Sequence, residues 1–158
     1  MTFVMQPAQF PSGGYPSGSD RAPGSDQTYP RGVPVTWDTG SQELDAHSTD
    51  PTTNILGISQ EGVASGVADN PSATVNFVLA GRENIFVAKL TNSSGVVQTP
   101  DTANINIVYA LLKNGSGTTQ WWSLNEDDSS GGVAEVVQID LERNLVFFKF
   151  TEASIQQP

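Results

Sequence analysis

The chain has 158 residues, and its 17 acidic against 7 basic side chains give a net charge of −10 at pH 7. A field of this sign repels nucleic-acid phosphates and anionic lipid, so we expect neither nucleic acid nor a membrane as partner. The sequence holds no cysteine and one histidine, His47, which excludes disulfides, thiolate metal sites and two-histidine metal motifs. A catalytic triad would depend on His47 alone, which removes several common enzyme classes, and we expect no cofactor.

The length suits one domain with a sizeable core. No window approaches the apolar run that a transmembrane helix needs, and the first residues show no signal-peptide pattern. We therefore expect a soluble protein that is not exported.

Residues 1–30 differ from the rest, because five prolines alternate there with four glycines. Proline lacks an amide donor and restricts φ, so this segment is predicted to form neither a β-ladder nor a helix. We divide the chain into an extended N-terminal arm, residues 1–30, and a β domain, residues 31–158. Packing of the arm on its own domain is one interpretation, and contact with a neighbouring subunit is the other. For the second, the candidate contact residues are the apolar and aromatic side chains of the arm: Phe3, Val4, Met5, Phe10, Tyr15 and Tyr29.

From residue 31 onward, short β-type runs alternate with turn residues, and no stretch has a sustained helical period. The sequence therefore predicts an all-β fold of about eight strands, in a small barrel or a sandwich. The predicted strands are residues 33–37, 54–58, 73–80, 85–91, 105–112, 120–124, 133–140 and 145–151. Alternation at residues 105–111 places Ile105, Ile107, Tyr109 and Leu111 on one face and Asn104 and Asn106 on the other.

The segment 145–150 is apolar on both faces, which is typical of a central strand or of one covered by a partner. Phe148 is therefore a candidate subunit contact. We expect a homo-oligomer, and prefer a trimer over a dimer. Trp121 and Trp122 are adjacent in a predicted strand, so one faces the core and the other faces solvent or a partner. Trp122 is the candidate for the partner side.

Two polar clusters have the residue types of a metal site. Asp45, His47 and Asp50 are close in sequence, and residues 125–128 (Asn-Glu-Asp-Asp) are rich in oxygen ligands but lack the EF-hand spacing. Solvated loops show the same composition, and we favour that interpretation and predict no metal site. Carboxylate pairs could also hydrolyse glycosides, but no pair is singled out.

No basic residue lies between Arg31 and Arg82, whereas six acidic residues do. One side of the domain is therefore expected to be acidic. This surface could serve solubility alone, or it could dock on a basic protein surface.

The order of several segments resembles the head-decoration, or cement, proteins of tailed double-stranded DNA phages. The segments are residues 31–35, 55–62 and 75–82, Thr99-Pro100, the Trp121 strand, and residues 136–141 and 144–150. The resemblance implies a compact β-tulip or barrel that binds the major capsid protein on the outer surface of the phage head as a homo-oligomer, bridging capsomers without catalysis. It also implies assembly in the bacterial host cytoplasm. The long arm departs from the family pattern, and either replaces or extends the usual contacts.

A carbohydrate- or receptor-binding β module of a phage tail or cell surface is the alternative. Trp121, Trp122 and the acidic residues 125–128 would then form the binding site.

Overall fold

The computed structural model describes residues 3–9, 17–18, 23–24, 27–63 and 74–157. In these residues twelve strands form two sheets, and the helical segments are 3-10 turns of three residues. The predicted all-β fold is confirmed. Within the described ranges, no helix has the length and apolar character needed to cross a membrane.

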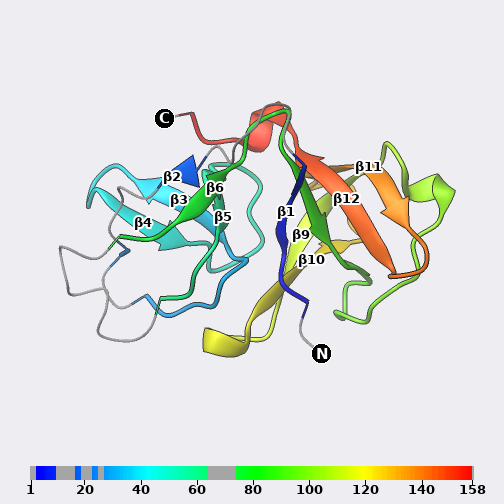
Figure 1. The fold of residues 1–158 in the computed structure, drawn as a ribbon, viewed down its shortest axis with the longest axis horizontal. Coiled ribbons are helices and arrows are strands. Elements are labelled where there is room, and N and C mark those ends of the chain that lie inside the picture. The colour runs from blue at the N-terminus through cyan, green and yellow to red at the C-terminus, as the bar shows by residue number, and fades with distance from the viewer. Residues whose placement is uncertain (1–2, 10–16, 19–22, 25–26, 64–73, 158) are drawn as a thin grey trace.

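The larger sheet has seven strands in the order β1-β7-β12-β11-β9-β10-β8. Lys89 alone separates β7 from β8, although β7 is second in this order and β8 is last. The sheet therefore curls until its last strand meets β7, and the Lys89 carbonyl accepts a hydrogen bond from the Leu124 amide at 3.0 Å. The result is a small barrel, on the right in Figure 1. Its strands are β1 (Gln6–Gln9), β7 (Ile85–Ala88), β8 (Leu90–Thr91), β9 (Val108–Asn114), β10 (Trp121–Asn125), β11 (Ala134–Asp140) and β12 (Leu145–Phe150).

The barrel is filled by aromatic side chains. Alternation along β12 points Phe148 and Phe150 inward, where they meet Phe86 of β7 with ring centroids 5.3 to 5.9 Å apart. Trp122 of β10 is fully buried in the same core. β12 lies between β7 and β11, which confirms the prediction of a central strand.

The smaller sheet has five strands in the order β2-β6-β5-β3-β4 and lies on the left in Figure 1. Its buried side chains, such as Val35 and Ile58, belong to the same hydrophobic cluster as Phe86 and Phe148. One core therefore joins both sheets. The strands are β2 (Ser17–Gly18), β3 (Pro34–Asp38), β4 (Glu43–Ala46), β5 (Gly57–Ser59) and β6 (Phe77–Leu79).

The C-terminal residues tie the barrel to the smaller sheet. After β12 and a 3-10 turn at Glu152–Ser154, Ile155 bridges to Ile55. The Gln156 side-chain amide then pairs with the backbone of Trp37 in β3, accepting from its N–H at 2.7 Å and donating to its carbonyl at 2.8 Å. In Figure 1 this end of the chain passes above the smaller sheet.

The prediction that the arm forms no ladder is wrong. β1 pairs antiparallel with β7, and Met5 and Tyr29 are both 1% exposed in the common core. Proline is compatible with this ladder because β1 is an edge strand and its register shifts between Pro7 and Gln9. The described part of the arm is therefore built into both the sheet and the core.

The alternation predicted for residues 105–107 is also wrong, because β9 begins only at Val108. Asp101 and Asn104 form a capping box around a 3-10 turn at Thr102–Asn104, and this turn buries Asn104. Asn106 adopts a positive φ of 66°, which a strand does not allow, and Ile107 is 38% exposed. Side-chain capping therefore overrides the period-two pattern here.

Gly32 lies where the arm meets β3. Its φ is +82°, and a Cβ there would lie 2.8 Å from the Met5 carbonyl oxygen. We expect Gly32→Ala to lower the free energy of unfolding by about 2–4 kcal/mol, since it combines backbone strain with displacement of Met5. Gly117→Ala is the control, because Gly117 also has a positive φ but a Cβ added there would meet no atom of the other described residues within 4 Å. Urea unfolding compares the two variants, and equal losses would contradict the close packing.

Gln156→Ala removes both hydrogen bonds to Trp37 and leaves part-buried backbone groups without that partner. We expect a loss of about 1–2 kcal/mol in unfolding free energy. Gln157→Ala, at the exposed neighbouring residue, should change stability little. A Gln156→Ala variant as stable as the Gln157→Ala control would show that the C-terminal residues do not hold the sheets together.

Candidate functional site

Four predicted contact residues lie in the core of the chain itself. Met5, Tyr29, Trp122 and Phe148 are at most 1% exposed, so their assignment to an intersubunit or capsid surface is wrong. Their apolar character reflects packing in the common hydrophobic core. Phe10 and Tyr15 fall outside the described residues.

The remaining two, Phe3 and Val4, are half-buried and line a groove of about 320 Å³. Pro30 and Arg31 form another part of its wall, and Trp121 at the start of β10 lies in the wall as well. Three segments that are distant in sequence therefore meet at this surface, which we call the arm groove.

Trp121 and Trp122 point to opposite faces of β10, as predicted. The assignment of Trp122 to the solvent or partner side is wrong, because Trp122 faces the core. Trp122 is buried, with its indole N–H 3.4 Å from the Gln120 side-chain oxygen, whereas Trp121 is half-buried. Trp121 also borders a second, more polar hollow of about 370 Å³, with Ser94 and Asn114 in its lining. Of this pair, Trp121 is therefore the one that a ligand could contact.

Positive charge gathers around Phe3. The Lys89 ammonium lies 5.6 Å from the centre of the Phe3 ring, a distance typical of a cation–π contact. Arg31 is exposed, and no carboxylate in the described part of the chain pairs with it. Arg82, Arg143 and Lys149, by contrast, each pair with an acidic side chain.

The β3–β4 hairpin carries an acidic surface. Asp38 and Glu43 are direct partners across the two strands, and Asp45 follows on the same face of β4. Burial raises the pKa of Asp45, and the nearby Asp38 and Glu43 raise it further. The buried hydroxyl of Tyr29 has no hydrogen-bond partner among the described residues. Its pKa is raised by burial and, to a smaller extent, by Asp45 of this hairpin and by Glu61.

The residues of the first predicted polar cluster have separate contacts. His47 Nε2 lies 3.3 Å from the Asn54 carbonyl, and burial lowers its pKa. Asp50 accepts a hydrogen bond from the Lys113 amide of β9, and Asp45 lies beside Gly24. The described residues contain no group of three or more ligating side chains placed to hold a metal.

The second cluster, residues 125–128, builds turns. Asp128 accepts hydrogen bonds from the Ser130 and Gly131 amides, which lower its pKa. Asp127 instead accepts from the Ser93 amide in another loop. These carboxylates serve backbone donors, as the solvated-turn interpretation predicted.

Sequence reasoning missed the groove itself. The signal in the sequence was Arg31, a basic residue between Pro30 and Gly32 at the junction of the arm and β3. No pattern in the sequence indicated that Phe3 and Trp121 would lie beside Arg31. No family model, curated protein or solved structure matches the chain.

The raised pKa of Asp45 leads to a pH-dependent prediction. The folded state holds this proton more tightly than the unfolded state, so unfolding free energy falls as pH rises above the ordinary carboxyl range. Asp45→Asn removes that loss, and we expect it to stabilise the protein at pH 7 by less than about 1 kcal/mol, since the group is partly exposed to solvent.

The gain should shrink towards pH 3, where the native Asp45 is protonated. Thermal unfolding from pH 3 to pH 8 measures it, with Glu83→Gln on the exposed β6–β7 turn as the control. A gain independent of pH would contradict the assigned cause.

Proposed function

We propose that this protein decorates the outer surface of a phage head as a structural, non-enzymatic homo-oligomer that binds the major capsid protein and bridges capsomers. The observation that carries the proposal is the acidic β3–β4 hairpin, where Asp38, Glu43 and Asp45 share one two-stranded ribbon. Such a ribbon complements a basic protein surface and repels packaged DNA.

Two further features support this function. The all-β fold agrees with what the resemblance of residues 31–151 implies for head-decoration proteins. The hairpin is also held rigidly, because β3 pairs with β4 and β5 and its Trp37 backbone is bound by Gln156. A rigid charged ribbon repeated over many copies can bind a capsid through avidity, although each contact is weak.

Co-sedimentation with purified heads that lack the protein tests the proposal. We expect wild-type occupancy to fall as salt rises, because the contact is electrostatic. The pair Glu43→Gln and Asp45→Asn should weaken binding by about tenfold at low salt and flatten the salt dependence. Glu83→Gln should bind like wild type.

Failure of the wild-type protein to bind heads at any salt concentration would refute decoration. Binding to glycans that is lost in Trp121→Ala would then favour the alternative, a carbohydrate-binding module that uses the half-buried Trp121.

A further inference from the structure

We infer that the arm groove is the docking site for a second copy of this chain, and that the side chain it receives is Leu141 from the turn between β11 and β12. This inference rests on the proposed homo-oligomer and assigns its interface. The groove is lined by Phe3, Val4 and Trp121, with Arg31 at its wall.

Leu141 has the exposure expected of a docking residue. It is 58% exposed and, together with Val96 at 57%, it is one of the two most exposed large apolar side chains in the described ranges. A leucine in this position leaves apolar surface in water, which burial in an apolar groove would remove. Val96 and Val97 are also exposed, but they lie in a loop with no acidic neighbour in sequence.

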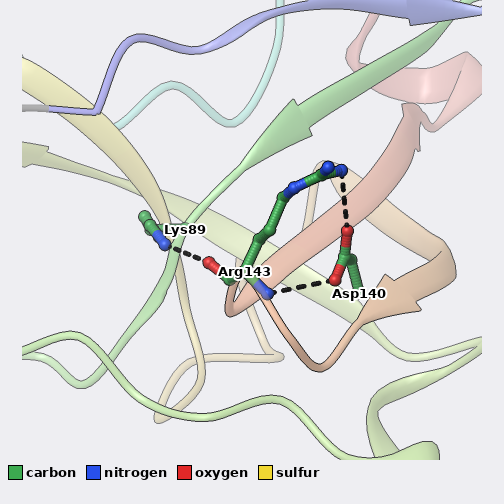
Figure 2. Close-up of polar contacts among 3 residues, drawn as sticks. All are labelled: Lys89, Asp140 and Arg143. Atoms are coloured by element: carbon green, nitrogen blue, oxygen red, sulfur yellow. Dashed lines mark hydrogen bonds and ion pairs between the residues drawn. The ribbon is translucent and has the colours of Figure 1, made fainter.

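The turn that presents Leu141 is held in place. Asp140 accepts hydrogen bonds from the Arg143 amide at 3.0 Å and from its guanidinium at 3.4 Å. Figure 2 shows these contacts together with Lys89, whose ammonium donates to the Arg143 carbonyl at 2.5 Å. A turn ordered before binding loses little conformational entropy on docking.

Charge favours the same pairing. Glu142 follows Leu141, is exposed, and forms no ion pair within the described residues. Arg31 at the groove is likewise exposed and unpaired with any described carboxylate. Two copies that each carry a charge of −10 repel one another over most orientations. An orientation that brings Glu142 to Arg31 replaces part of this repulsion by attraction.

Lys89 shows that the groove and the turn are neighbours. Its ammonium contacts the Phe3 ring on one side and the Arg143 carbonyl on the other. With donor turn and receiving groove adjacent, a two-fold axis lets each copy insert Leu141 into the other at once. This arrangement favours a dimer over the trimer preferred from the sequence.

Charge reversal tests the pairing. Arg31→Glu and Glu142→Arg alone should each raise the dimer dissociation constant by at least about tenfold, measured by analytical ultracentrifugation over a concentration series. An equimolar mixture of the two variants should form mixed dimers, because each contact then joins opposite charges. The double variant should also recover the dimer.

Leu141→Asn should weaken the dimer without any change in charge, and Glu83→Arg is the control for a distant reversal. Circular dichroism checks that each variant is folded. A wild-type protein that stays monomeric, or a dimer that is indifferent to all of these substitutions, would overturn the inference.

Head co-sedimentation of the same variants separates the two proposals. A wild-type dimer that responds to the reversals but does not bind heads would refute decoration and leave this interface standing. Head binding by a protein whose dimer ignores the reversals would refute the interface alone.

Discussion

The structure depends on the packing of residues 3–7 between the two sheets. On one side Gly32, at the entry to β3, allows the Met5 backbone to approach closely because it has no Cβ and a positive φ. On the other side β1 pairs with β7. Met5 is thereby buried in the core. The N-terminal arm, although rich in proline and glycine, therefore contributes to the packing that joins the barrel to the smaller sheet.

The one-residue link between β7 and β8 is the second constraint. It curls the larger sheet into a barrel and so creates the enclosed space for Phe86, Phe148 and Phe150. The linking residue, Lys89, must then point outward, where its ammonium reaches both Phe3 and the β11–β12 turn. Closure of the core thus also arranges the surface around the arm groove.

Charge is distributed unevenly over this framework. The β3–β4 hairpin gathers acidic side chains closely enough to raise the pKa of Asp45, whereas the arm groove has an exposed arginine and a lysine nearby. The two proposed contacts use these regions separately, since the acidic hairpin suits a basic capsid protein and the groove suits the Leu141–Glu142 turn of another copy. The two proposals therefore assign different surfaces of the molecule, and neither contact would block the other.

The sequence by itself determined the all-β class and showed that β12 is covered on both faces, because period-two patterns and apolar runs are local properties of the chain. Only the tertiary structure decided that β12 is a central strand and not one covered by a partner. The sequence also predicted that Trp121 and Trp122 face opposite ways. It could not decide which of them faces inward, nor that Met5 and Tyr29 enter the core, because burial depends on which strands meet. The alternation at residues 105–107 failed where Asp101 and Asn104 cap a turn, and the arm groove joins residues near positions 3, 31 and 121. Contacts between such distant segments are set by tertiary packing, and no local pattern records them.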